Sequence, residues 1–184
     1  MLITFFQGYF SLYSSVITFR FNDVVFYINR IARGGSGASS ASTYPVLMTY
    51  LKSSPAFVLG NINSKKYCSL SFVLCTSKTI SVDNYKFYFT SKENLFFNKV
   101  QTVLRENPKL CSSVFELFKK DFSHISVNSE IHVGGPLLLR KKTVLRYICL
   151  SEDIYLNPNI LQPQLNTILQ LMFKLNLEQK NITL

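Results

Sequence analysis

The sequence predicts an α+β fold whose C-terminal half is a two-layer sandwich and whose N-terminal part is a β-rich extension. Residues 85–89 place aromatic side chains at alternate positions, as in a strand with one buried face. Residues 94–105 and 163–175 repeat apolar side chains at helical spacing. Between them, 131–150 is extended in pattern and contains a glycine-proline bend, and 181–184 suits a last short strand. This order of elements is that of a ferredoxin-like sandwich.

The first part of the chain is a candidate extension followed by a linker. Residues 1–33 form the extension, in which Ser15 to Ile28 alternates as two strands joined by a turn at Asn22-Asp23. Residues 34–43 are rich in Gly and Ser, which indicates a flexible linker or an RNA-contacting loop. A phosphate-binding loop is disfavoured because no lysine follows before Lys52.

Residues 44–84 are an extension of uncertain structure. Within it we expect a short helix over Tyr44 to Leu51, closed by Ser53-Ser54-Pro55, and a strand over Lys66 to Leu74. The remaining residues, 85–184, are predicted to form the ferredoxin-like domain.

The helices of that domain are predicted from their apolar stripes. Ser91 is placed to cap the helix over 94–105, and Pro108 interrupts the pattern before a second helix over 110–122. The final helix is expected to hold Pro163 in its first turn. The stripes are Phe96, Val100, Val103 and Leu104, then Cys111, Val114, Phe115, Phe118 and Phe122, then Leu165, Ile168, Leu169, Met172 and Leu175.

The formal charge of +10 favours polyanionic partners, either nucleic acid or an anionic membrane surface. The strongest local feature is Arg140-Lys141-Lys142 followed by Arg146, in a segment predicted to be extended. Cations at that spacing would follow a phosphate backbone and release its counterions, although a solvated hairpin with a few basic residues is the other reading of the run. Secondary RNA contacts are expected at Lys119, Lys120, Lys65, Lys66, Arg30 and Arg33, and the off-stripe aromatics Phe97 and Tyr147 are candidates for stacking on bases.

Catalysis and metal binding find no motif in the chain. Cys68, Cys75, Cys111 and Cys149 form no C-x-x-C pair, and His124 and His132 complete no zinc pattern, so we expect buried, reduced thiols and no metal. With ten acidic residues and no nucleophile or nucleotide-binding signature, the chain is expected not to be an enzyme and to need no cofactor or small-molecule substrate.

The origin of the chain is suggested by its residue usage. Phe, Tyr, Asn, Ile, Lys and Leu dominate, which indicates an AT-rich genome such as a mitochondrial one. Met1 to Phe19 is apolar but broken by Gln7, Gly8 and several Ser, which makes a poor membrane span. Residues 1–33 carry three arginines and one acid, as a mitochondrial transit peptide does, and a retained extension explains this equally well.

Residues 85–184 resemble the small-subunit ribosomal protein ten family. Tyr85-Lys86-Phe87-Tyr88-Phe89-Thr90-Ser91 is similar to its opening strand, and Leu165 to Leu184 is similar to its closing helix and strand. Between them, Gly135-Pro136-Leu137-Leu138-Leu139 and Thr143-Val144-Leu145-Arg146 resemble its G-P-x-x-L and T-V-L-R signatures in the same order. Asn107 to Glu130 looks like an insertion.

The resemblance implies a structural, rRNA-binding component of the small-subunit head of a mitochondrial ribosome, in the mitochondrial matrix, with ribosomal RNA and neighbouring small-subunit proteins as partners. Gly135 and Pro136 would shape the entry of the hairpin, Thr143 would seat its strand, and Arg146 would contact phosphates with Arg140, Lys141 and Lys142. The alternative is an accessory subunit of an organellar membrane complex, which would also explain the apolar start.

Overall fold

The computed structural model describes residues 17–33, 42–62, 77–119, 123–134, 138–149 and 157–180. It confirms the α+β class, with strands predominating. The described elements are β1 Ile17–Phe21, β2 Val24–Arg33, β3 Ser42–Leu51, β4 Phe57–Asn61, β5 Ser77–Val82, β6 Tyr85–Ser91, α1 Asn94–Glu106, α2 Pro108–Leu117, β7 His124–Gly134, β8 Leu138–Ile148 and α4 Pro158–Lys174.

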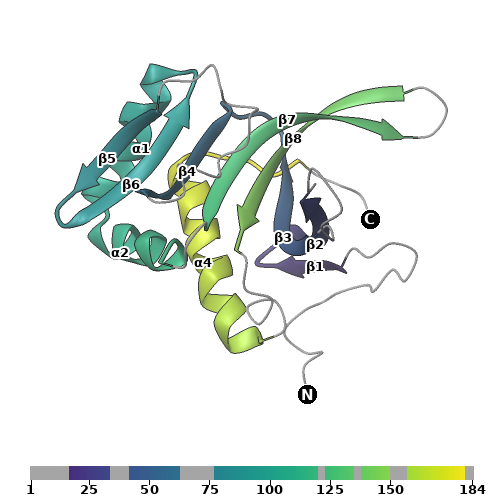
Figure 1. Cartoon of the computed structure of the whole chain (residues 1–184), viewed down its shortest axis with the longest axis horizontal. Helices are drawn as coiled ribbons and strands as arrows, with labels where there is room; N and C mark the ends of the chain where they lie inside the picture. Colours follow the sequence, from purple (N-terminus) through teal and green to yellow (C-terminus); the bar gives the residue numbers. More distant parts are fainter. Residues whose placement is uncertain are drawn as a thin grey trace.

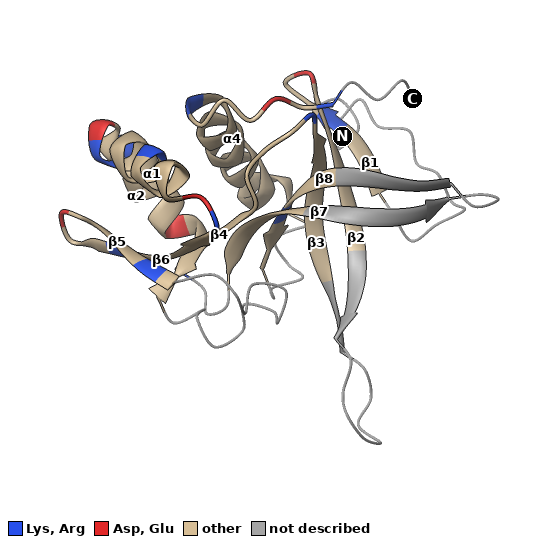
Figure 2. Cartoon of the chain, turned by 90° about the horizontal axis from the view of Figure 1, so that it is seen from above, with Lys and Arg blue, Asp and Glu red and all other residues tan. Residues whose placement is uncertain are grey.

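The eight described strands belong to one antiparallel sheet, in the order β1-β2-β3-β8-β7-β4-β6-β5 (Figure 1). The described helices, α1, α2 and α4, lie on one side of it (Figure 2). Residues 44–84, whose structure the sequence left uncertain, supply most of β3 together with β4 and β5. Because β3 pairs with β8 and β4 pairs with both β6 and β7, the N-terminal strands are interleaved with the C-terminal ones.

The sheet contains two split βαβ arrangements, in which two parallel strands flank an antiparallel one. In the first, β6 and β7 are joined through α1 and α2 and flank β4. In the second, β8 leads through α4 to a single bridge at Gln179, which pairs with Leu51 of β3 on the side opposite β8. In each unit the antiparallel strand between the two parallel segments, β4 or β3, therefore comes from the first 61 residues.

The helix expected over Tyr44 to Leu51 is wrong, because these residues form most of β3. Leu47 and Leu51 are buried in the core beneath the helices, and Val46 and Met48 are buried on the other face of the sheet. A strand that is apolar on both faces loses the two-residue alternation by which a strand is recognised. The linker predicted over 34–43 overlaps this strand at Ser42 and Thr43, and residues 34–41 lie outside the described residues.

The turn predicted at Asn22-Asp23 is confirmed. These two residues join β1 to β2 with φ values of 46° and 64°. Asn and Asp adopt this left-handed conformation more readily than other side chains, and two such residues match the twist of a hairpin. Asp83, with φ 49°, begins the corresponding turn between β5 and β6.

The first two helices agree with the sequence in position and differ at their ends. In α1, Phe96, Val100 and Leu104 are buried as predicted. α2 begins at Pro108 rather than 110, because proline suits the first helical position, and it ends at Leu117 rather than at 122. Phe122 lies outside the described residues. The predicted capping by Ser91 is wrong, because the N-cap residue of α1 is Glu93. The Ser91 hydroxyl accepts a hydrogen bond from the Glu93 amide at 3.2 Å, outside the helix.

The last helix begins five residues before the predicted start. Asn157 caps it through a 3.0 Å hydrogen bond from the Asn159 amide, and Pro158, not Pro163, occupies the first position. Pro163 lies inside the helix. The helix ends in a Schellman motif, with Asn176 at φ 55° and the Leu177 amide donating to the Met172 carbonyl at 2.9 Å.

One core joins the helical layer to the sheet. The predicted stripe of the last helix is confirmed, with Leu165, Ile168 and Met172 buried against the strands. Cys111 and Cys149 are buried free thiols, as predicted, and burial raises the pKa of the Cys111 thiol. Cys68, Cys75 and the strands expected over 66–74 and 181–184 lie outside the described residues.

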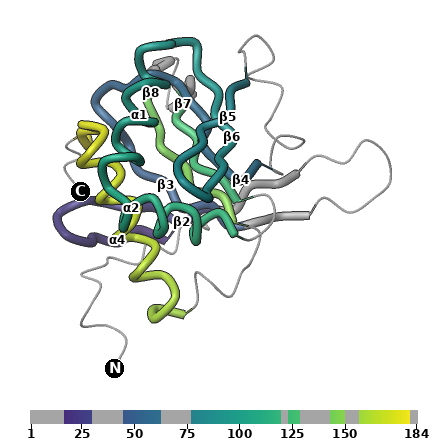
Figure 3. Tube along the Cα trace, turned by 90° about the vertical axis from the view of Figure 1, so that its left-hand side faces the viewer, coloured from purple at the N-terminus to yellow at the C-terminus, as the bar shows by residue number. Residues whose placement is uncertain are grey.

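Gln179 connects the last described segment to β2. The ladder between β2 and β3 stops at Tyr27 and Met48, and the chain around Gln179 takes its place beside β3. The Val25 amide donates to Gln179 Oε1 at 3.2 Å, and Gln179 Nε2 donates to the Val25 carbonyl at 2.8 Å and to Thr49 Oγ1 at 3.0 Å. One carboxamide thus replaces the missing rung of the ladder. In Figure 3 the N-terminal hairpin, in purple, is seen next to α4.

Replacing Gln179 with Leu is expected to destabilise the protein by about 1–3 kcal/mol, because the buried Val25 amide loses its partner. Urea denaturation of both proteins measures this difference. The control is Glu178→Gln, which removes only an exposed ion pair with Lys52 and should have the smaller effect. Equal losses in the two variants would contradict the role given to the carboxamide.

Candidate nucleic-acid interface

The β7–β8 hairpin continues beyond the sheet as a two-stranded ribbon. The two strands pair along their whole length, from His124 with Ile148 to Gly134 with Leu138. Among the described residues, β4 pairs only with 124–127 of β7 and β3 only with 143–148 of β8. The outer parts of the hairpin therefore pair with each other alone, and in Figure 1 they extend away from the body of the protein.

Three of the four predicted phosphate contacts lie on this ribbon. By backbone register, Arg140 is opposite His132, Lys141 opposite Ile131 and Lys142 opposite Glu130. The side chains of these residues lie outside the described part of the chain, as do Gly135 and Pro136 at the bend. The ribbon thus brings three consecutive cationic positions beyond the body of the sheet.

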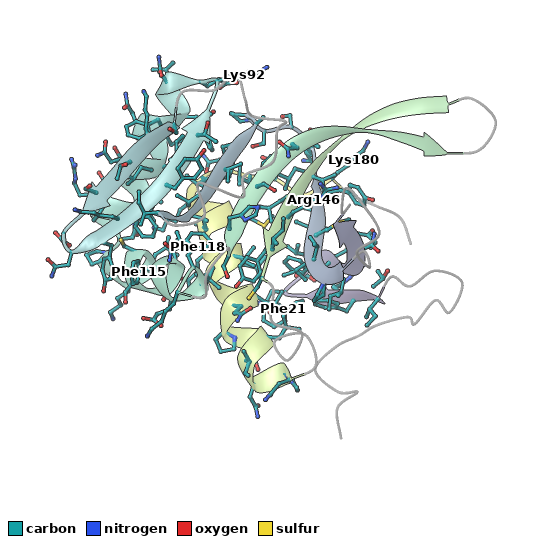
Figure 4. All side chains as sticks on the ribbon, viewed as in Figure 1. Phe21, Lys92, Phe115, Phe118, Arg146 and Lys180 are labelled. Carbon is teal, nitrogen blue, oxygen red and sulfur yellow. The ribbon has the colours of Figure 1, made fainter. Side chains whose placement is uncertain are left out.

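Arg146 and Thr143 lie at the base of the ribbon, within the sheet. Thr143 is half-buried and pairs with Leu51 of β3 and Ser129 of β7. Arg146, also half-buried, is opposite Met48 on one side and Ser126 on the other (Figure 4). The fourth cation therefore stands apart from the other three, where β8 is held between β3 and β7.

The secondary candidates are spread over the molecule. Arg30 and Arg33 are on β2, which reaches β8 through β3. By register they lie beyond one end of the β3–β8 pairing, at Ile148, whereas Arg140 lies beyond the other end, at Thr143. The two groups are up to about 40 Å apart along the strands at about 3.3 Å per residue. Lys119 is exposed after α2 and forms a 3.3 Å ion pair with Glu116. Lys120, Lys65 and Lys66 lie outside the described residues, as do the side chains of Arg30 and Arg33.

The two aromatic candidates have structural roles. Tyr147 is fully buried, and its hydroxyl donates to the Leu117 carbonyl at 3.0 Å, so it packs in the core and cannot stack on a base. Phe97 is partly buried against the core, with the Lys78 ammonium 4.7 Å above its ring. This cation–π contact occupies one face of the Phe97 ring.

Sequence reasoning missed an aromatic pair near the base of the ribbon. Tyr27 of β2 and Tyr50 of β3 meet edge to face, with ring centroids 5.2 Å apart, on the sheet face that also carries Met48 and Arg146. They form a small second cluster with Val144, separate from the main core. The pair was missed because Tyr50 fell in the segment predicted to be helical, and the pairing of β2 with β3 that brings the two rings together leaves no local pattern in the sequence.

Partial burial raises the pKa of the Tyr27 phenol, and the neighbouring Tyr50 adds to the shift. Both causes favour the neutral phenol, so the two rings are uncharged on the face of the sheet to which Arg146 also belongs by register. The two rings are partly buried and pack against Val46, Met48 and Val144, so the pair belongs to the second apolar cluster of this face.

Other chemistries have little support among the described residues. No three His, Cys, Asp or Glu side chains of that part come together as a metal site. None of its helices is long and apolar enough to cross a membrane. Comparison of the chain with protein-family models, with curated proteins and with solved structures finds no match.

Replacing Tyr50 with Phe should lower the pKa of Tyr27 and leave it above the ordinary value of about 10, because burial is the larger cause and remains. An NMR titration of ring-labelled tyrosine measures this. A tyrosine whose pKa is higher in the folded than in the unfolded state stabilises the fold at pH values below its unfolded pKa. That stabilisation is lost as the pH rises through the folded pKa, so the free energy of unfolding should fall at alkaline pH. An unchanged Tyr27 pKa in the variant would rule out the coupling.

Proposed function

We propose that this chain is a structural, rRNA-binding component of the small subunit of a mitochondrial ribosome, held in the head region and acting in the matrix. The observation that carries the proposal is the β7–β8 ribbon, which pairs only with itself among the described residues and bears Arg140, Lys141 and Lys142. The chain works by placement rather than by turnover, so no cofactor or small substrate is required.

The ribbon suits this role because of its shape and charge. A pair of strands is narrow enough to enter a groove or pass between RNA helices, and its internal hydrogen bonds keep it extended. Cations along one strand neutralise successive phosphates and release counterions. Such contacts position the chain without reading sequence. At the base, the half-buried Arg146 and the partly buried Tyr27–Tyr50 pair share one face of the sheet, and their exposed parts would add a second, smaller contact with RNA.

We propose that residues 85–184 form a modified ferredoxin-like unit. The order β6, α1 with α2, β7, β8, α4 and the bridge at Gln179 supports it. In that fold the two split units fill each other's gaps, whereas here β4 and β3 fill them. We therefore place RNA binding in residues 85–184 and assign to β3 and β4 the support of the hairpin.

The neighbouring small-subunit proteins are expected at surfaces other than the ribbon. β1 and β5 stand at the two ends of the described strand order, and a partner could add a strand at either edge. The resemblance of residues 135–146 to the family's two hairpin signatures supports the same assembly.

Replacing Arg140, Lys141, Lys142 and Arg146 together with Ala should weaken binding to ribosomal RNA. Each phosphate contact contributes about 0.7–0.9 to the magnitude of the slope of log affinity against log salt. Loss of four contacts should therefore reduce that magnitude by about 3. Filter binding over a salt series measures this. The charge-matched control replaces the exposed Arg20, Lys86, Lys92 and Arg105 with Ala and should keep the slope near that of the unaltered chain.

An equal change in both variants would reject the hairpin as the binding element. The assembly itself is tested by sedimentation of the tagged chain with ribosomal particles. We expect release by high salt or ribonuclease, because the attachment is to RNA. A chain that resists both and is released only by detergent would instead be a membrane-complex subunit.

A further inference from the structure

A groove lies on the helical layer, where the corner between α1 and α2 meets the last turn of α4. Its volume is about 530 Å³, and Pro108, Lys109, Leu110, Gln170, Phe173 and Lys174 are among its lining residues. The ribbon and the Tyr27–Tyr50 pair do not contribute to it. The groove is therefore separate from the candidate RNA surface.

Phe173 gives the groove an exposed apolar wall. Its side chain is 78% exposed, whereas Leu171 and Met172 beside it in α4 are buried. Phe173 and Lys174 follow Gln170 by three and four residues, so both lie next to it on the same side of the helix. A phenylalanine left in water forgoes the free energy that burial of its ring would contribute, and it becomes an anchor when a partner covers it.

The charge of the groove is mainly positive. In the part of the chain that the structure describes, Lys109 and Lys174 form no ion pair, and Glu106 is the acid in the lining. α2 begins at the groove whereas α1 and α4 end there, so the helix dipoles do not decide the sign of its charge and the two lysines do. The last carbonyls of α4 are already bonded, Leu171 to the Leu175 amide and Phe173 to the Asn176 amide.

We propose that this groove binds an acidic segment of a partner protein, with an apolar side chain packed on Phe173 and carboxylates paired with Lys109 and Lys174. Protein is favoured over RNA for two reasons. The exposed phenylalanine and Pro108 suit an apolar side chain, and Glu106 interrupts the cations that a continuous phosphate chain would need. The inference goes beyond the proposed function and does not depend on it.

Three probes test the proposal on the full-length chain. They are a short fluorescent peptide of glutamate, leucine and phenylalanine, the same peptide with lysine in place of glutamate, and an oligouridine of equal length. Fluorescence anisotropy should show saturable binding of the acidic peptide, weakened by salt. The lysine peptide should not bind. In NMR spectra the shifts on binding should centre on Lys109, Gln170 and Phe173.

The variants locate the site. Phe173→Ala should weaken binding of the acidic peptide about tenfold, as expected for an interface anchor. Lys109→Glu with Lys174→Glu should weaken it at least as much. The matched control is Leu95→Ala, because Leu95 on α1 is 83% exposed and lies outside the groove. It should change binding less than twofold, and circular dichroism should show all variants folded.

Three results would overturn the proposal. One is no saturable binding of the acidic peptide. A second is equal binding by the Phe173 and Leu95 variants. The third is loss of oligouridine binding in Phe173→Ala with no effect on the peptide, which would assign the groove to RNA. Because these measurements leave the ribbon unaltered, their failure is distinct from failure of the hairpin's RNA binding.

Discussion

The pairing of β3 with β8 holds the two halves of the chain together. Six successive backbone pairs, from Val46 with Ile148 to Leu51 with Thr143, insert a strand from the N-terminal part beside the hairpin. Both faces of this region are buried, with Leu145 and Tyr147 under the helices and Val144 on the opposite side. Because β8 is clamped over these residues, its outer part leaves the sheet in a defined direction, which is what a projecting ribbon requires.

The candidate surfaces belong to different layers of the molecule. The ribbon and the Tyr27–Tyr50 pair are built from strands, whereas the groove at Phe173 is built from helix ends. The helical layer carries cations and acids in mixture (Figure 2), so positive charge is not confined to the hairpin. A charge of +10 is compatible with one anionic partner on the ribbon and another, smaller one on the helices.

The sequence predicted the helices and turns that depend on residues close together in the chain. The stripe of Phe96, Val100 and Leu104 identified α1, and Asn22-Asp23 identified a hairpin turn. β3 was misassigned because both of its faces are buried, and the start of α4 was misplaced because either of two prolines suits a first turn. Strand order depends on long-range pairing, so no pattern in the sequence predicted that β4 lies between β6 and β7 or that Tyr27 meets Tyr50.

The carboxamide of Gln179 closes on Val25, 154 residues earlier in the chain. During translation, β2 therefore cannot complete this rung of its ladder until residue 179 has been synthesised and has folded back onto it. Pairings this remote slow folding and leave strand edges exposed meanwhile. A partly synthesised chain that lacks residue 179 therefore leaves the Val25 end of β2 without the carboxamide that bonds it in the folded protein.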